Sequence, residues 1–423
     1  MKLHMSDRLI RGAWGLAILG SLSLSAGLAS GAPVAFENAR LVVGDGRASI
    51  PNATLIIDGD RIVAAGRAGE VTVPPTAQRI DLAGKTVMPA LIDTHVHVNQ
   101  PREALVSDLR RLAYFGVGTV LSLGVDTASA PFEVRAQPLP GAARLLTAGR
   151  GITAPEPGRE TAPYWVTTDQ EARRAVQENV DRGVDMIKVW VDDRRGSVQK
   201  LAPPLYRAVI ETAHRSGLRV TAHIYALDDA KGLLRAGVDA FAHSVRDRDV
   251  DEELLTLVRE RPSLVLNPNL TARGEVADLS WLAPVLRPDE LAKAQSRNVA
   301  NAEQHQAFLI QARNLQRMKA AGARIVLGTD TSFDFPAGNT PWAAHMELED
   351  MVAAGMTPSQ AIVAATSEAA AFLRLPDVGT LQPGYQADLL VLEADPTESI
   401  THTRRIAAVY LRGVRIDRSA YPQ

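Results

Sequence analysis

The 423-residue sequence contains no cysteine. This absence excludes disulfide bonds, thiolate catalysis, cysteine metal ligands and a lipid-anchored cysteine. Any metal ion would therefore have to be held by histidine, by carboxylate or by a modified side chain. The formal net charge is only -2, and no block of lysine and arginine exceeds a few residues. Because nucleic acid is bound mainly through neutralised phosphates, we expect no nucleic-acid partner.

Long apolar runs are also scarce, and the one near the N-terminus, "AWGLAILGSLSLSAGLA", is shorter than the roughly 20 residues of a membrane span. Basic residues precede this run, and the small residues at positions 30–32 follow it. This pattern predicts a secretory signal over residues 1–32 and a secreted or periplasmic protein with no stable membrane span after cleavage. An uncleaved N-terminal anchor is the alternative.

The chain has no internal repeat of solenoid period and no low-complexity tract. Residues 33–86 read as short hairpin strands with Asp-Gly turns, as in "ATLIIDGDRIVAAG", and a similar pattern returns in "ADLLVLEADP" near the C-terminus. We therefore predict a small composite β-sandwich domain built from residues 33–86 and 377–423.

Residues 87–376 alternate apolar, β-rich runs with amphipathic helical stretches. The eight runs are "VMPALIDTHVHV", "VGTVLSLG", "ARLLTAG", "DMIKVWV", "LRVTAHIY", "DAFAHSV", "SLVLNPN" and "ARIVLGTD". Near-continuous apolar strands indicate a parallel sheet covered on both faces, and eight such units predict an α/β fold of the TIM (β/α)8 barrel type. A doubly wound open sheet is the structural alternative.

Two histidines end the first of these runs. His95 and His97 are two residues apart, so both side chains point to the same face of the strand, into the expected barrel at its carboxyl end. Two imidazoles on one rigid strand suit zinc or a similar metal. The alternative is a pair of hydrogen-bonded structural histidines.

Four further polar residues occupy equivalent places in other runs: Lys188, His223, His243 and Asp330. Each alone has an ordinary structural interpretation, such as a core histidine or a helix-capping aspartate. Together, at the end of a barrel where active sites are built, they predict a metal centre.

Lys188 is the unusual member, because an ammonium group in an apolar strand beside metal ions would be repelled and poorly solvated. A neutral lysine can instead react with carbon dioxide to form a carbamate. This anion has two oxygens and could bridge two divalent ions, whose charge it would partly balance.

With these motifs, the chain resembles the amidohydrolase superfamily, in particular the binuclear, carboxylated-lysine members of the imidazolonepropionase-like and prolidase-like types. The resemblance implies a buried metal ion on His95, His97 and Asp330, and a more exposed one on His223 and His243. Carboxylated Lys188 and a nucleophilic hydroxide would bridge the two ions, which we expect to be Zn²⁺. Asp330 would move the proton to the leaving group, and Tyr225 would hydrogen-bond the substrate carbonyl.

Substrate contacts are predicted at Trp190, Tyr225 and Arg246, each near a predicted strand end. Trp190 could instead pack against an outer helix, and Tyr225 could be a packing aromatic of the rim. The charges in "VDDRRGS" and at Arg246 are interpreted as a solvated rim first and as substrate contacts second. Prolidase-type relatives commonly have Gly-Gly after the lysine strand and "EHG" at strand six, and this sequence differs at both places.

We therefore expect an exported metal-dependent hydrolase of amide bonds, with dipeptides, N-acyl amino acids or small aryl amides and carbamates as substrates. An esterase or lactonase using the same binuclear site is the alternative enzyme function. A non-catalytic, metal-stabilised binding protein is the remote alternative that is not an enzyme. The partner is a small-molecule substrate. A homo-oligomer of unspecified subunit number is expected.

Overall fold

The computed structural model describes residues 32–137, 139–158, 161–270, 273–333 and 340–422. The predicted secretory signal lies outside these ranges except for its last residue. Within the described ranges, no helix combines the length and the apolar character that crossing a bilayer requires.

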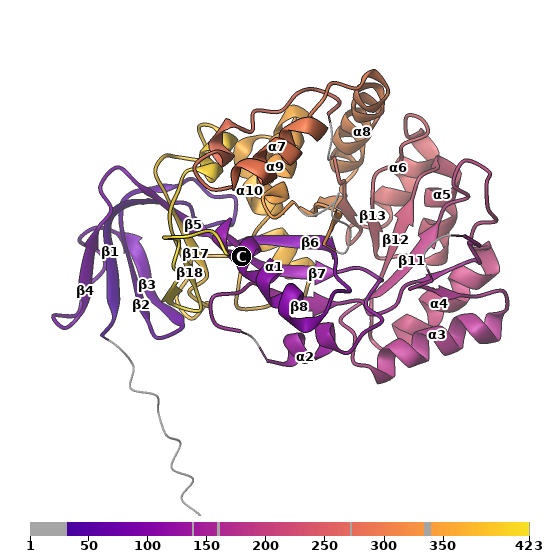
Figure 1. Cartoon of the computed structure of the whole chain (residues 1–423), viewed down its shortest axis with the longest axis horizontal. Coiled ribbons are helices and arrows are strands. Elements are labelled where there is room, and N and C mark those ends of the chain that lie inside the picture. Colours follow the sequence, from indigo (N-terminus) through magenta and orange to yellow (C-terminus); the bar gives the residue numbers. More distant parts are fainter. Residues whose placement is uncertain (1–31, 138, 159–160, 271–272, 334–339, 423) are drawn as a thin grey trace, which may run out of the picture.

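One sheet of eight strands is built from both ends of the chain (Figure 1). Its strands are β1 (Val34–Leu41), β2 (Ile50–Asp58), β3 (Arg61–Arg67), β4 (Gln78–Asp81), β5 (Thr86–Pro89), β17 (Leu389–Leu392), β18 (Ile406–Leu411) and β19 (Val414–Arg415). Strand β5 pairs antiparallel with β17, which joins the two ends. The predicted turn at Gly59 lies between β2 and β3, with a φ of 56° that glycine adopts without strain. The division of the chain into two domains remains a prediction.

Parallel strands make up two further sheets, in the orders β10-β9-β11-β12-β13-β14-β15 and β16-β6-β7-β8. Their strands are β6 (Leu91–His97), β7 (Val117–Ser122), β8 (Arg144–Thr147), β9 (Ile152–Thr153), β10 (Tyr164–Trp165), β11 (Ile187–Val191), β12 (Val220–Ile224), β13 (Ala240–Ala242), β14 (Val265–Asn267), β15 (Arg324–Ile325) and β16 (Thr331–Ser332). Each of the eight predicted apolar runs contains a strand, whereas β9, β10 and β16 were not predicted.

The segment between β15 and β16 lies alongside β6. The Thr94 amide donates to the Leu327 carbonyl at 3.0 Å, and the Asp330 amide donates to the His95 carbonyl at 2.8 Å. Since β15 belongs to one parallel sheet and β16 to the other, this segment brings the two sheets together next to His95 and His97.

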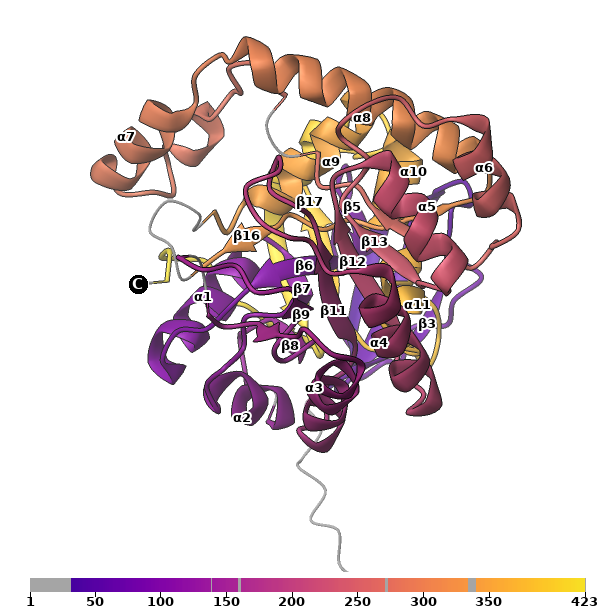
Figure 2. The same cartoon turned by 90° about the vertical axis from the view of Figure 1, so that its right-hand side faces the viewer.

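Helices surround the parallel strands in the view of Figure 2. They are α1 (Arg102–Tyr114), α2 (Ala130–Ala136), α3 (Asp169–Asp181), α4 (Pro203–Arg215), α5 (Leu227–Ala236), α6 (Glu252–Arg259), α7 (Pro288–Arg297), α8 (Ala302–Ala320), α9 (Ala343–Ala353), α10 (Pro358–Ala364) and α11 (Ser367–Phe372), with short 3-10 turns η1 (Ser280–Leu282) and η2 (Ile400–Arg404). Helix α3 begins with a capping box of Thr168 and Glu171, and α5 ends at Gly237 in the left-handed conformation.

Both faces of the parallel strands are buried, as the near-continuous apolar runs predict. All six residues of β7 are buried. Val120 and Leu121, which are adjacent in this strand and point to opposite faces of the sheet, belong to two different apolar clusters. With apolar packing on each side, polar side chains in these strands have little access to water except near the carboxyl ends.

Candidate metal centre

His95 and His97 lie at the end of β6, as predicted. The His95 side chain is fully buried, and burial, together with nearby Lys188, lowers the pKa of its imidazole well below the ordinary value. The two rings are in edge contact, with centroids 5.0 Å apart. Neutral imidazole is the form that binds a metal ion, so the environment of His95 favours the ligand state.

Lys188 is the second residue of β11 and is fully buried. Its Nζ lies 3.4 Å from His95 Nε2 and 5.2 Å from the centroid of the Trp190 ring. Burial lowers the pKa of Lys188 to about 7. A lysine with this pKa has a large neutral fraction near neutral pH, which is the condition that carbamate formation requires.

His223 and His243 follow on the next two strands. His223 is the fourth residue of β12, paired in register with Trp190, and His243 comes directly after β13. Their ring centroids are 4.5 Å apart, and the ring of His243 is 5.2 Å from that of His95. Burial lowers the pKa of His223 to about 4 and that of His243 well below its ordinary value.

Asp330 lies between β15 and β16 and points toward these histidines. Its Oδ1 is 2.9 Å from His97 Nε2 and 3.2 Å from His95 Nε2, and its Oδ2 is 3.9 Å from His243 Nε2. Burial alone would raise the pKa of Asp330, but His95, His97 and Lys188 outweigh it and hold the pKa well below its usual range. The residue has a φ of 57°, a left-handed conformation that is uncommon outside glycine and recurs at functional sites.

These six side chains fit a divalent metal centre. One oxygen of Asp330 and one nitrogen each of His95 and His97 lie within 4.8 Å of one another, close enough to bind one ion. His95, His223 and His243 are held neutral and Asp330 is ionised, which matches the protonation that metal ligands need. Six residues from five separate places in the sequence therefore supply nitrogen and oxygen donors to one region, and no cysteine is required.

The sequence profile of the Amidohydrolase family matches residues 86–416. The chain belongs to the amidohydrolase family. This amidohydrolase is 26% identical to imidazolonepropionase from Streptomyces griseus subsp. griseus over 386 residues, which cover 87% of this chain and 93% of the relative. A solved structure from Bifidobacterium longum, provisionally described as a prolidase, is 27% identical with a TM-score of 0.74, covering 92% of this chain and 96% of that chain.

A solved Xaa-Pro dipeptidase with methionine in its active site shares the fold, with a TM-score of 0.72 at 21% identity over 91% of this chain and 99% of that chain. The resemblance drawn from the motifs is thus confirmed. The family and these relatives identify this amidohydrolase as a hydrolase that acts on carbon-nitrogen bonds, in a family that generally uses divalent metal ions at a binuclear site.

Trp190 of this amidohydrolase faces the interior, on the side of Lys188. A side chain in place of Gly124 or Gly151 would collide with the Trp190 ring, at 2.4 and 2.0 Å respectively. Glycines on the neighbouring segments therefore make room for the indole beside Lys188. This position favours the pocket interpretation of Trp190 over packing against an outer helix.

Tyr225 and Arg246 lie together beyond the ends of β12 and β13. The Arg246 amide donates to the Tyr225 carbonyl at 2.9 Å, and the Arg246 guanidinium donates through Nη2 to His243 Nδ1 at 2.7 Å. Ligation of an ion through His243 Nε2 places the ring proton on Nδ1, which cannot accept this hydrogen bond. Arg246 must therefore leave His243 when His243 binds an ion in this way.

Two residues that contact the candidate ligands were not predicted to do so. Asp192 was interpreted as a solvated rim charge, but it is buried and its Oδ2 lies 2.9 Å from His223 Nε2. Asn269, which follows β14, accepts a 3.0 Å hydrogen bond from His95 Nδ1. The rim interpretation of Asp192 is therefore wrong. The sequence feature that could have indicated its contact with the candidate ligands is its position directly after the strand that contains Lys188, four residues further along the chain.

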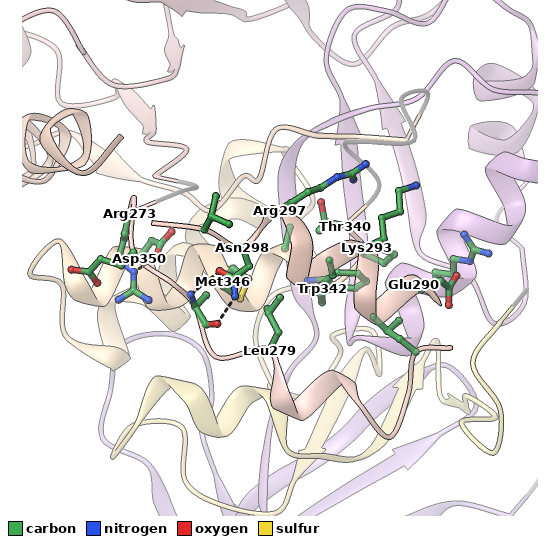
Figure 3. A pocket seen from close by; sticks show the side chains of 18 of the residues that line it. Arg273, Leu279, Glu290, Lys293, Arg297, Asn298, Thr340, Trp342, Met346 and Asp350 are labelled. Carbon is green, nitrogen blue, oxygen red and sulfur yellow. Dashed lines mark hydrogen bonds and ion pairs between the residues drawn. The ribbon is translucent and has the colours of Figure 1, made fainter. Parts of the chain in front are cut away.

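A cavity of about 620 Å³ lies elsewhere, between the segment containing α7 and the start of α9 (Figure 3). Its lining combines the apolar side chains of Leu279, Trp342 and Met346 with Lys293 and Arg297 of α7. None of the six candidate ligands lines this cavity. The cavity is therefore separate from the metal centre, and the site assignment does not depend on it.

Proposed function

We propose that this amidohydrolase is an exported enzyme that hydrolyses the amide bond of N-acyl amino acids, dipeptides included, at a binuclear centre. The observation that carries the proposal is the convergence of His95, His97 and Asp330 within 4.8 Å, with Lys188 3.4 Å from His95. We further propose that the two parallel sheets belong to one closed (β/α)8 barrel, since the segment before β16 already follows β6 through backbone hydrogen bonds.

The proposed ligands are His95, His97 and Asp330 for one ion and His223 and His243 for the other, with carboxylated Lys188 between them. Two divalent ions, expected to be zinc, would supply Lewis acidity toward the substrate carbonyl and lower the pKa of an attacking water. For carboxylation, neutral Lys188 Nζ forms a bond to the carbon of carbon dioxide and releases one proton to solvent. The pKa of about 7 supports this step near neutral pH.

Asp330 is the proposed proton carrier. Its carboxylate is ionised at neutral pH because neighbouring His95, His97 and Lys188 hold its pKa low, and its side chain remains 38% exposed. It can therefore accept a proton from water and deliver it to the leaving nitrogen. An amine leaves poorly without a proton, so amide cleavage needs this transfer more than ester cleavage does.

Arg246 supports a substrate that carries a carboxylate. Its guanidinium is partly buried beside His243, and its Nε atom is buried without a hydrogen-bond partner among the described residues. Once it leaves His243, it can pair with an anionic group, and a guanidinium suits a carboxylate because both are planar and bidentate. Tyr225, next to it, would donate to the substrate carbonyl.

Matched substrates test this proposal. The metal-loaded protein without residues 1–32 is assayed on N-acyl amino acids, on the same compounds as C-terminal carboxamides, and on neutral aryl amides, carbamates and esters, each with and without chelator. We expect chelator-sensitive cleavage that needs the free carboxylate. Arg246→Met should raise KM for the acids by at least about 10-fold and leave the carboxamides unchanged.

Cleavage of the neutral compounds alone would contradict the carboxylate assignment and point to a pocket built around Trp190, whose ring lies beside Lys188. Preference for esters over matched amides would favour the esterase alternative. Equal activity with and without chelator would contradict the metal mechanism itself.

A further inference from the structure

The two ring nitrogens of His223 have different surroundings. Nε2 lies 2.9 Å from Asp192 Oδ2, and because a carboxylate only accepts hydrogen bonds, this nitrogen carries the proton. Asp192 is itself well fixed. Its Oδ1 accepts from the Arg194 amide at 2.8 Å, and its Oδ2 also accepts from Arg194 Nη1 at 3.0 Å. The carboxylate is buried, and both of its oxygens take part in these hydrogen bonds.

A metal ion cannot bind on the Nε2 side of His223. Arg194 Nη1 lies 3.4 Å from the same Nε2, so a permanent positive charge already occupies that side. The nitrogen that remains for a metal ion is Nδ1. The ring also faces His243, whose ring centroid is 4.5 Å away in an edge-on arrangement.

His95 has the same kind of arrangement with the nitrogens exchanged. Its Nδ1 donates to Asn269 Oδ1 at 3.0 Å, and the Asn269 amide is oriented by a 2.8 Å hydrogen bond from its Nδ2 to the Gly328 carbonyl. His95 Nε2 is then free of a proton, and this is the nitrogen that lies 3.2 Å from Asp330 Oδ1. In His95 the hydrogen bond to a neighbouring residue thus leaves the nitrogen that faces the other ligands without a proton.

We propose that Asp192 is the positioning residue of His223, which it holds in the tautomer and orientation that direct Nδ1 toward the second metal position. This inference rests on the proposed metal centre. Carboxylates that accept the second N-H of a ligating histidine fix its ring and raise its basicity, and their loss typically weakens metal binding 10- to 100-fold. Asp192 therefore contributes to the affinity of the ion held by His223 and His243 without touching it.

Metal content and affinity test the proposal without any assay of turnover. Wild type, Asp192→Ala and Asp192→Asn are loaded with Zn²⁺, dialysed and analysed for ions per chain, and each ion is then titrated with a competing chromophoric chelator. We expect Asp192→Ala to weaken the binding of one of the two ions by about 10- to 100-fold and to leave the binding of the other unchanged. Asp192→Asn should recover part of this affinity, because its amide oxygen can accept the same hydrogen bond from His223.

Asp193→Asn is the matched control. Asp193 is the adjacent carboxylate of the same loop, where it caps the turn through the Gly196 amide at 3.0 Å and approaches Lys200 at 3.9 Å. The Asp193→Asn substitution removes one negative charge from the same region, but it does not remove the hydrogen bond between Asp192 and His223. Its metal content and affinity should equal those of wild type, whereas a loss equal to that of Asp192→Ala would show a general charge effect and overturn the proposal.

Unchanged affinity of both ions in Asp192→Ala, with the fold intact by circular dichroism, would also overturn it. Equal losses in Asp192→Asn and Asp192→Ala would contradict orientation by a hydrogen bond and indicate direct ligation by the carboxylate. If the proposed metal centre itself is wrong, the result differs from all of these, because wild type would then bind no ions.

Discussion

At the scale of single residues, Asp330 is constrained in its hydrogen bonding, its backbone conformation and its charge. It is hydrogen-bonded to His97, it lies in a left-handed conformation, and its neighbours keep it ionised. We predict that Asp330→Asn lowers kcat by at least about 100-fold, because an amide cannot carry the proton, while asparagine tolerates the same backbone conformation. Steady-state kinetics on the metal-loaded variant, with circular dichroism as the folding control, test this. Near-wild-type kcat would contradict the proposed role.

Lys188 allows a test of the carbamate. Lys188→Ala removes the lysine nitrogen that lies 3.4 Å from His95 Nε2 and leaves a space in the strand where the side chain was fully buried. We expect loss of turnover and fewer bound ions, both partly restored by a short carboxylic acid such as acetate or propionate, whose two oxygens can replace those of the carbamate. Metal analysis and activity are measured with and without the acid. If the acid raised the activity and metal content of wild type and variant by the same factor, the prediction would be contradicted.

Candidate ligands could be picked out in the sequence where a polar side chain lies in or directly after an apolar run, and their roles stay predictions. His95, Lys188 and His223 stand out in this way, and the structure brings them together. Asp192 did not stand out, because paired opposite charges, as in "DDRR", are typical of a solvated surface. Asn269 follows a strand in "NPN", where asparagine is common in turns. Whether such a side chain points outward or back to a histidine depends on contacts between segments that are distant in sequence.

At the scale of elements, α9 is tied to both the end of α1 and η2 by one histidine. His345 is fully buried, with Nε2 donating to the Phe115 carbonyl at 2.9 Å and Nδ1 3.0 Å from Thr403 Oγ1. Burial lowers the pKa of His345 to about 4. The unfolded chain therefore binds an extra proton between about pH 6.5 and 4, so this contribution to stability is complete above pH 6.5 and is lost as the pH falls toward 4.

The expected loss is about 3 kcal/mol over this range, from about 1.4 kcal/mol for each unit of pKa difference. We predict that His345→Gln, which can still donate to Phe115, has a smaller decrease in its urea midpoint between pH 6.5 and 4 than wild type. The two proteins are compared by urea unfolding at several pH values in this range. Parallel curves for the two proteins would contradict the assignment of this pH dependence to His345.

The strands were predictable because their composition follows from burial on both faces. Every apolar run between residues 87 and 330 contains a strand, and the Asp-Gly turn between β2 and β3 lies where the sequence placed it. The two-residue strands β9, β10 and β16 were not predicted, since so short a segment carries no periodicity. Their pairing is decided by neighbouring strands rather than by their own residues.

At the scale of the whole molecule, the candidate ligands come from both parallel sheets. His95 and His97 belong to the sheet that contains β6, whereas Lys188 and His223 belong to the sheet that contains β11 and β12. Asp330 lies on the segment that connects them. A centre that binds two ions therefore crosslinks parts of the chain that are far apart in the sequence and belong to different sheets.

Metal binding should accordingly stabilise the whole fold and not only the site. A ligand that binds the native state alone adds about 2.7 kcal/mol at a free concentration 100 times its Kd. We predict that Zn²⁺ raises the Tm of the metal-depleted protein, that chelator reverses this, and that Asp330→Asn and His97→Ala lose most of the increase. Differential scanning calorimetry at fixed free Zn²⁺ measures it. An equal rise in Tm in wild type and both variants would mean that the ions bind elsewhere, and the proposed centre would then be contradicted independently of any substrate.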